Sequence, residues 1–181
     1  MNTLYTIGHS TRTFEQFLAL LNAFDIQLVV DVRTIPKSRH NPQFGQDMLS
    51  PALQAAGIGY TYLGSLGGLR HTTKDSINTG WRNLSFRGYA DYMSTDTFQE
   101  GLQKLKALAE KQRVAILCAE AVPWRCHRSL IADALTVQGW QVLDIINEKA
   151  PTAHKLTPFL KIEHGQITYP SMQLDFSNQI G

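Results

Sequence analysis

The densest group of chemically capable side chains in this 181-residue chain lies between residues 118 and 128. It contains Cys118 and Cys126, and Cys126 is followed directly by His127 and Arg128. The last three of these residues are expected at the start of a helix, where free amides and the helix dipole bind anions and lower the pKa of a thiol. Cys126 is therefore a candidate nucleophile, with a purely structural role equally open, and His127 and Arg128 are candidate anion-binding groups.

The spacing within this group argues against several known kinds of site. A phosphatase loop places an arginine six residues after its cysteine, whereas residue 124 is Trp and the arginine is Arg125. This disfavours a protein-tyrosine-phosphatase or simple rhodanese-like loop. Seven residues separate the cysteines, which matches no standard zinc spacing, so we assign no metal ligands. Cys118 is more simply interpreted as a small buried residue at a strand end.

Other polar residues follow the predicted strands. Glu120 comes just after a buried strand, and a carboxylate there needs a partner or a place at the mouth of a cleft. It is a candidate general base or hydroxyl-binding group, with pairing to an arginine as the alternative. Asp31 and Arg33 point to one face after another strand. His9 and Ser10 follow the first strand, and His9 is an acid-base group, a ligand or a hydrogen-bonded loop residue.

Periodicity in the sequence predicts the elements that position these residues. Short apolar runs predict buried strands at residues 4–7, 27–32, 60–63, 114–118 and 140–146. Apolar residues at helical spacing predict helices at 14–24, 47–56, 89–93, 98–111 and 127–138. Thr13 with Gln16, and Thr97 with Glu100, match the capping box that begins many helices.

The alternation of strands and helices predicts a three-layer α/β fold. Its sheet is expected to be mainly parallel, with about five strands, and a small C-terminal hairpin is expected around residues 164–165. We expect an α/β domain over residues 1–146 and a C-terminal extension, 147–181, packed on the same domain. Ligands of such sheets bind beyond the carboxyl ends of the strands, which is where the candidate residues fall.

Charge is distributed unevenly along the chain. The net charge is only +2, too small by itself to indicate nucleic acid or membrane. The four segments 8–13, 31–45, 64–88 and 118–128, which follow predicted strands, hold ten Lys or Arg residues and three acids. The rest of the chain is acidic. One end of the domain is therefore predicted to attract phosphates, carboxylates or nucleic acid, unless these side chains are merely solvated on long loops.

Several classes of protein are disfavoured by what the sequence lacks. It contains no glycine-rich dinucleotide fingerprint and no Walker phosphate loop, so its cofactor stays unknown. Two cysteines are too few for a disulfide scaffold, and no apolar stretch approaches the roughly 20 residues of a membrane span. The first residues do not resemble a signal peptide, so we expect a cytoplasmic protein without a membrane partner.

Six ordered motifs resemble the family called domain of unknown function 488. They are Thr6-Ile-Gly-His-Ser10, Asp31-Val-Arg33 with Pro36 and Ser38, Phe44, Leu66-Gly-Gly68, Arg87-Gly-Tyr89, and Cys118-Ala-Glu120 through Cys126-His-Arg128. The resemblance spans the chain to about residue 146. It implies a compact α/β domain and adds Ser10, Ser38 and Arg87 to the candidate anion-binding residues, but it implies no particular reaction.

The leading hypothesis is a binding or catalytic site for an anionic, phosphate-bearing ligand, either a nucleotide or a nucleic-acid component. Arg33, Arg87 and Arg128 would hold the anion, and Glu120 with His9 or Asp31 would move protons. The first alternative is a noncatalytic module that binds nucleic acid or a protein. The second is a cysteine redox or metal site. The sequence leaves the oligomeric state open.

Overall fold

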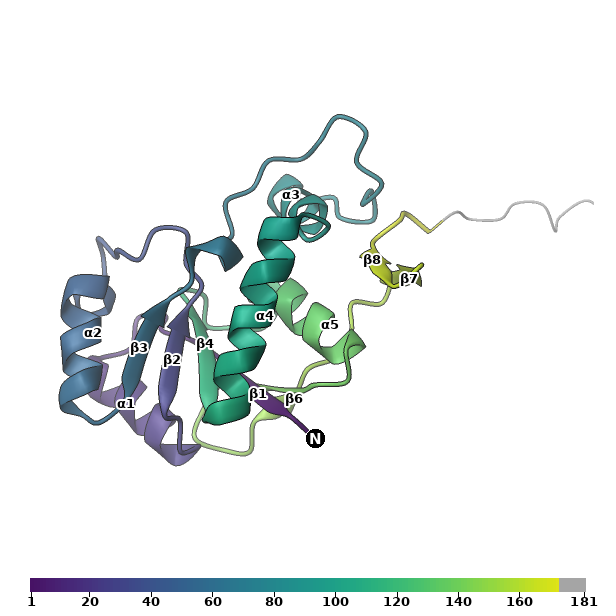
Figure 1. The fold of residues 1–181 in the computed structure, drawn as a ribbon. Coiled ribbons are helices and arrows are strands. Elements are labelled where there is room, and N and C mark those ends of the chain that lie inside the picture. Colours follow the sequence, from purple (N-terminus) through teal and green to yellow (C-terminus); the bar gives the residue numbers. More distant parts are fainter. Residues whose placement is uncertain (173–181) are drawn as a thin grey trace, which may run out of the picture.

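Five short parallel strands form the centre of the computed structural model, which describes residues 1–172 (Figure 1). The sheet has the order β3-β2-β4-β1-β5-β6, and its last strand, β6, runs antiparallel to β5. The strand bounds are β1 Thr3–Gly8, β2 Leu28–Asp31, β3 Gly59–Tyr62, β4 Val114–Cys118, β5 Gln141–Ile145 and β6 Thr152–Ala153. The predicted α/β fold with a mainly parallel sheet is confirmed, and β6 is the strand that the sequence did not indicate.

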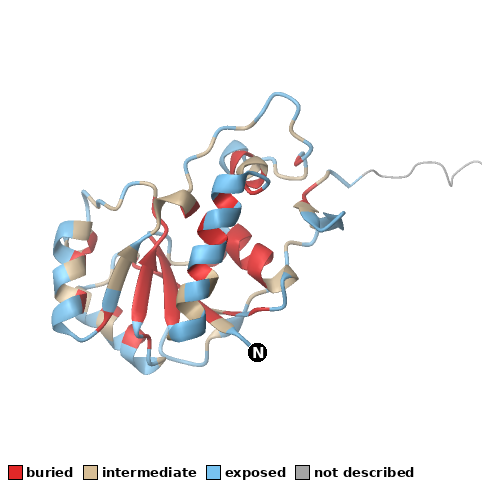
Figure 2. Ribbon diagram, in the orientation of Figure 1, coloured by how far each residue is buried: buried red, intermediate tan, exposed pale blue. Residues whose placement is uncertain are grey.

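Helices cover both faces of the sheet and give it three layers. On one face lie α1 (Phe14–Ala23) and α2 (Gln46–Ala55), and on the other lie α3 (Leu84–Tyr92), α4 (Asp96–Lys111) and α5 (Arg128–Val137). Successive residues of a strand point to opposite faces, so Val29 packs with the first group and Val30 with the second. The strands β2 and β4 are buried along their whole length (Figure 2), which explains their nearly continuous apolar sequences.

Two helices begin earlier than the sequence predicts. The short helix expected at 89–93 starts at Leu84, because the Asn83 side chain accepts hydrogen bonds from the backbone amides of Ser85 and Phe86. The cap of α4 is Thr95 rather than Thr97, since the Thr95 hydroxyl accepts from the amide of Phe98. The predicted capping box at the start of α1 is present, with both hydrogen bonds between Thr13 and Gln16.

The segment after β5 returns to the main body and ends in the predicted hairpin. The hairpin strands are β7 (Lys161–Glu163) and β8 (Gln166–Thr168). Asp133 of α5 is fully buried and accepts hydrogen bonds from the side chains of His154, Thr157 and Tyr169. This carboxylate anchors the segment to α5. Residues 173–181 of the predicted extension lie outside the described part of the chain.

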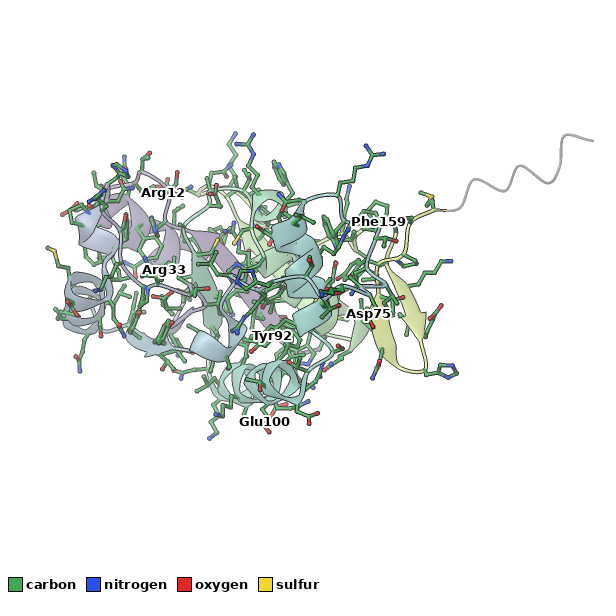
Figure 3. The ribbon with its side chains drawn as sticks, turned by 90° about the horizontal axis from the view of Figure 1, so that it is seen from above. Arg12, Arg33, Asp75, Tyr92, Glu100 and Phe159 are labelled. Atoms are coloured by element: carbon green, nitrogen blue, oxygen red, sulfur yellow. The ribbon has the colours of Figure 1, made fainter. Side chains whose placement is uncertain are left out.

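The loops that follow β1, β2, β3 and β4 emerge at one edge of the sheet, the carboxyl edge. Figure 3 looks down from this side, with Arg33 over the sheet and Glu100 of α4 at the border. Three 3-10 turns shape these loops: η1 (Pro42–Phe44), η2 (Gly64–Leu66) and η3 (Pro123–Arg125). Within residues 1–172, no helix is both long and apolar enough to cross a membrane.

Candidate functional site

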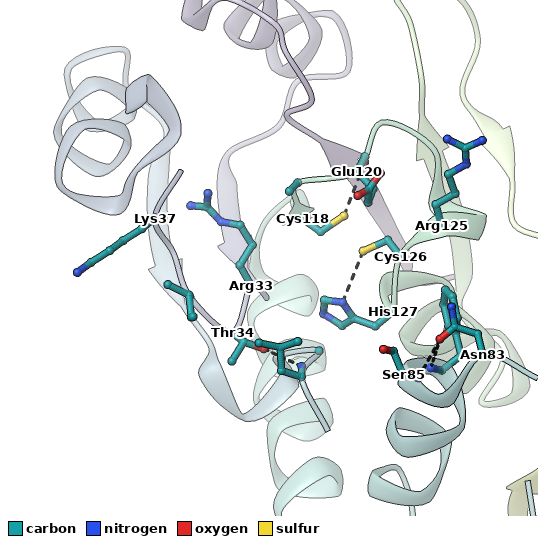
Figure 4. A pocket seen from close by; sticks show the side chains of 15 residues that line it. Arg33, Thr34, Lys37, Asn83, Ser85, Cys118, Glu120, Arg125, Cys126 and His127 are labelled. Atoms are coloured by element: carbon teal, nitrogen blue, oxygen red, sulfur yellow. Dashed lines mark hydrogen bonds between the residues drawn. The ribbon is translucent and has the colours of Figure 1, made fainter. Parts of the chain in front are cut away.

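A pocket of about 460 Å³ opens at the carboxyl ends of β2 and β4 (Figure 4). Its walls come from residues after β2, from residues 68–69, from the start of α3 and from the 118–127 loop. The charged residues among them are Arg33, Lys37, Glu120 and Arg125, three cations against one acid. The predicted candidates Arg33, Glu120, Cys126 and His127 are therefore brought together in this first pocket.

A second pocket, of about 560 Å³, lies beside the first one. It is lined by the loop after β1, the 38–41 segment and the 119–125 segment, and it contains the candidates His9, Ser10 and Ser38. Glu120 and Arg125 line both pockets, so these two residues stand at the boundary between them. The candidates from three separate strand ends thus meet around Glu120.

Arg33 is fixed by the aspartate two residues before it. Its Nε donates to Asp31 Oδ1 over 2.9 Å and its Nη2 donates to Asp31 Oδ2 over 2.7 Å. Burial alone would lower the pKa of Arg33, but the hydrogen bonds and charge of Asp31 outweigh burial and raise it. The third nitrogen, Nη1, has no hydrogen-bond partner among the described residues, although Arg33 is only 6% exposed. Asp31 is fully buried and lines neither pocket, and it also accepts a hydrogen bond from Tyr60.

Arg128 is fully buried beneath the 118–122 loop and lines neither pocket. Its guanidinium donates to the Cys118 sulfur, to the carbonyls of Glu120 and Ala121, and to the Thr6 hydroxyl. These contacts hold the loop in place. They also leave Arg128 without an ion pair to a carboxylate in residues 1–172.

Gly8 makes the close packing of this loop possible. A Cβ at Gly8 would lie 1.6 Å from the Glu120 carbonyl oxygen. The amides of His9 and Ser10 then donate to the carbonyls of Cys118 and Ala119. The glycine after the first strand is therefore required by a backbone contact, in addition to ending the strand.

The two cysteines and His127 are neighbours in the wall of the first pocket. The Cys126 sulfur lies 3.5 Å from His127 Nδ1, and the Cys118 sulfur is next to the Cys126 sulfur (Figure 4). His127 Nε2 lies 2.8 Å from the Val32 carbonyl, which can only accept, so this nitrogen carries the proton. Burial lowers the pKa of His127 to about 4, so the ring is neutral near pH 7 and its Nδ1 has a free lone pair.

The two thiols differ in acidity. Burial raises the pKa of both, and for Cys126 the hydrogen bond to Cys118 raises it further, well above the usual range. For Cys118, the hydrogen bond from Cys126 and the positive charge of Arg128 outweigh burial and lower the pKa. The sequence placed the activated thiol at Cys126, at the helix start, whereas these contacts favour Cys118.

His9 lines the second pocket with its ring stacked on Phe44, at a centroid distance of 4.5 Å. Its Nδ1 lies 2.8 Å from the Ser10 carbonyl, so Nδ1 carries the proton and Nε2 has the free lone pair. Burial lowers the pKa of His9. Ser10 adopts a left-handed backbone conformation with a φ of 51°, which costs energy in a residue other than glycine.

Two of the predicted anion-binding residues have other contacts. The Ser38 hydroxyl lines the second pocket and accepts from the Asn41 amide. Arg87 lines neither pocket, and its Nε donates to the Trp81 carbonyl.

Sequence reasoning did not single out Trp124 or Lys37. The indole of Trp124 is 65% exposed and lines the second pocket next to Arg125. A tryptophan directly before an arginine in the 118–128 group could have been recognised from the sequence as a candidate binding residue. Lys37 gave no such signal, because its place in the first pocket depends on the path of an irregular loop.

A metal centre has no evident set of ligands. In residues 1–172 no group of three or more His, Cys, Asp or Glu side chains is arranged to hold a metal ion.

Comparison with protein families found one match, to the family described as Domain of unknown function DUF488, over residues 13–135. The matched region covers more than half of the chain, so the chain belongs to this family, whose description assigns no activity. The match includes the motifs from Asp31 to Arg128, and the Thr6–Ser10 motif precedes it. Comparison with curated proteins and with solved structures found no match.

Proposed function

We propose that this member of the family binds a phosphate-bearing anion, a nucleotide or a nucleic-acid component, in the two adjoining pockets at the carboxyl edge. The observation that carries this proposal is Arg33. The Arg33 guanidinium is nearly buried and clamped by Asp31, and its Nη1 is a buried donor without a partner among the described residues, which is costly to leave unsatisfied. A phosphate oxygen is a suitable acceptor, because charge-assisted hydrogen bonds of arginine to phosphate are among the stronger ones in proteins.

The charges around the first pocket support an anion rather than a neutral ligand. Lys37 and Arg125 are exposed and line the same pocket as Arg33. Asp31 balances the charge of Arg33, so the excess positive charge comes from Lys37 and Arg125, with Glu120 as the one acid among the residues that line this pocket. A pocket with this balance concentrates anions near its mouth.

Trp124 supports a nucleotide in preference to a bare phosphate. Its exposed indole lines the second pocket beside Arg125, and a nucleobase stacks on such a ring for about 1–3 kcal/mol. We propose that the phosphate occupies the first pocket near Arg33 and that the base reaches Trp124 in the second. Arg125, which lines both pockets, would contact the middle of the ligand.

Proton transfer would be carried out by Glu120 and His9. Glu120 is exposed at the boundary of the pockets, and neutral His9 offers the lone pair of Nε2 in the second one. Asp31 and Arg128 enter the proposal as positioning residues, because their polar atoms are already used by protein partners. We keep the cytoplasm as the proposed location, since both cysteines are free thiols, the usual state in that compartment.

The test is equilibrium binding of AMP and of inorganic phosphate, measured by calorimetry and by tryptophan fluorescence. We expect AMP to bind more tightly than phosphate and to quench Trp124, and Trp124→Ala to remove that difference. Arg33→Lys retains a counter-charge for Asp31 but lacks the planar fork of arginine, so it should weaken both probes about tenfold or more. AMP binding that is unchanged in Arg33→Lys would refute the proposal.

Two double variants distinguish the effect of the pocket cations on binding from the effect of the protein's overall charge. Lys37→Gln combined with Arg125→Gln removes two pocket cations, and Lys104→Gln combined with Lys111→Gln removes two from exposed positions of α4. Only the first pair should weaken AMP binding. A single-stranded oligonucleotide tests the noncatalytic alternative, since contacts with many phosphates make affinity fall steeply between about 50 and 200 mM salt.

A further inference from the structure

Arg128 is a fully buried cation whose charge requires compensation. It makes no ion pair with a carboxylate in residues 1–172, and its acceptors are two carbonyls, one hydroxyl and the Cys118 sulfur. The thiol is the one acceptor among these that gains a full negative charge by losing a proton at accessible pH. The buried Asp144 is linked to Arg128 through the Thr6 hydroxyl, which accepts from Arg128 and donates to Asp144. The Cys118 sulfur contacts the guanidinium directly. Because a buried charge without a counter-charge in direct contact is costly, the site favours Cys118 as a thiolate.

Cys118 has a second sulfur as its neighbour. The Cys126 sulfur is next to it (Figure 4), and both residues line the first pocket despite their low exposure. Cys126 in turn lies 3.5 Å from the unprotonated Nδ1 of His127, which can accept its hydrogen bond. Two sulfurs, one of them in contact with a buried cation, therefore lie together in one pocket wall.

We propose that Cys118 and Cys126 form a redox-active dithiol that exchanges with a low-molecular-weight, anionic disulfide bound in the first pocket. Arg33, Lys37 and Arg125 line this pocket, so its charge selects a disulfide that carries carboxylates. Cys118 is the attacking residue and Cys126 is the resolving one. This proposal is independent of phosphate binding.

The exchange balances as two substitutions at sulfur. The Cys118 thiolate attacks one sulfur of the disulfide, the S–S bond of the substrate breaks, and one substrate thiolate leaves. Cys126 then gives its proton to the first departing thiolate and attacks the Cys118 sulfur, which releases the second thiolate. The Cys118 thiolate and the Cys126 thiol are oxidised to one disulfide, the substrate disulfide is reduced to two thiolates, and of these one takes the Cys126 proton and the other takes a proton from water.

The steps are separated by treating the reduced protein and its variants with glutathione disulfide, then alkylating and measuring intact mass and peptide masses. The wild type should form the Cys118–Cys126 disulfide and release two equivalents of glutathione. Cys126→Ser should stop as a mixed disulfide at Cys118, and Cys118→Ser should react at least about tenfold more slowly. A mixed disulfide that maps to Cys126, Cys118→Ser that reacts like the wild type, or a wild type that stays reduced would each overturn the proposal.

Cystamine, a cationic disulfide, tests the role of the pocket charge. Lys37→Gln combined with Arg125→Gln should slow the reaction with glutathione disulfide about tenfold and should speed the reaction with cystamine, whose positive charges these two residues repel. Equal slowing of both probes would overturn the proposed selection of an anion. Binding of AMP to Cys118→Ser, measured in parallel, reports on the proposed phosphate site alone.

Discussion

Replacement of His127 by glutamine should flatten the dependence of stability on acid pH. Gln Nε2 can take the position of His127 Nε2 and donate to the Val32 carbonyl, but it does not titrate. In the native protein, burial lowers the pKa of His127 to about 4, whereas an unfolded chain has a histidine pKa near 6.5. The substitution therefore removes a proton-linked difference between the two states and keeps the hydrogen bond.

The sign and size of the effect follow from proton linkage. Above pH 6.5 the ring is neutral in both states, so His127 contributes no pH dependence. As the pH falls from 6.5 toward 4, the unfolded chain binds a proton that the native protein does not, and the free energy of unfolding decreases. With these two pKa values, the loss is about 2 kcal/mol at pH 5 and about 3 kcal/mol at pH 4.

The assay is urea denaturation of the wild type and His127→Gln at half-unit intervals between pH 4 and 7.5. The variant should lose about 3 kcal/mol less than the wild type across this range, with a residual slope from His9, whose pKa burial also lowers. His71→Gln is the matched control, because His71 is exposed. Parallel curves for wild type and His127→Gln would refute the neutral ring and, with it, the free lone pair on Nδ1.

Two further variants test the packing that shapes the site. Gly8→Ala should cost at least about 3 kcal/mol in urea denaturation, because the new Cβ meets the backbone of Glu120, whereas Gly45→Ala, whose Cβ would lie 3.3 Å from its nearest neighbour, should cost about 1 kcal/mol or less. Equal losses of stability in Gly8→Ala and Gly45→Ala would show that the loop at Glu120 moves easily to make room for a Cβ at residue 8. Asp133→Asn should cost about 3 kcal/mol and speed proteolysis of the C-terminal segment, because it replaces one acceptor oxygen with a donor beside Tyr169 and its neighbours. Unchanged proteolysis would show that the segment is anchored elsewhere.

A helix or strand was predictable wherever the pattern that indicates it lies within one short segment of the sequence. The strand at Val114–Cys118 and the capping box of Thr13 and Gln16 are local patterns, and the structure has both as expected. The antiparallel strand β6 was not predictable, because two exposed residues give no apolar run. The start of α3 was missed for a related reason, since its first turn is polar and exposed and its cap at Asn83 lies inside a long irregular segment.

The location of the candidate site was predictable from the sequence, whereas the roles of its side chains were less so. Parallel topology brings the residues after β1, β2 and β4 to one edge, so His9, Arg33 and Glu120 were expected near one another. The partners of each side chain depend on tertiary contacts that a single sequence does not display. The Arg128 guanidinium donates both to the Cys118 sulfur and to the Glu120 carbonyl of the 118–122 loop. Only this position shows that Arg128 holds the loop and that Cys118 is the more acidic thiol.

Seven of the ten basic residues in the segments at the carboxyl edge fall into two groups according to their position in the structure. One group donates to backbone carbonyls of the loops: Arg12 to Gly8 and Ile146, Arg70 to Gly64 and Gly67, Arg87 to Trp81, and Arg128 to Glu120 and Ala121. The other group, Arg33, Lys37 and Arg125, lines the first pocket. Because arginines of the first group already hold the irregular loops in place, little free energy is needed to order these loops when a ligand binds. We therefore expect substitutions in the first group to change stability before affinity, and substitutions of Lys37 and Arg125 to do the reverse. Loss of Arg33 would also cost stability, because it leaves the buried Asp31 without its counter-charge.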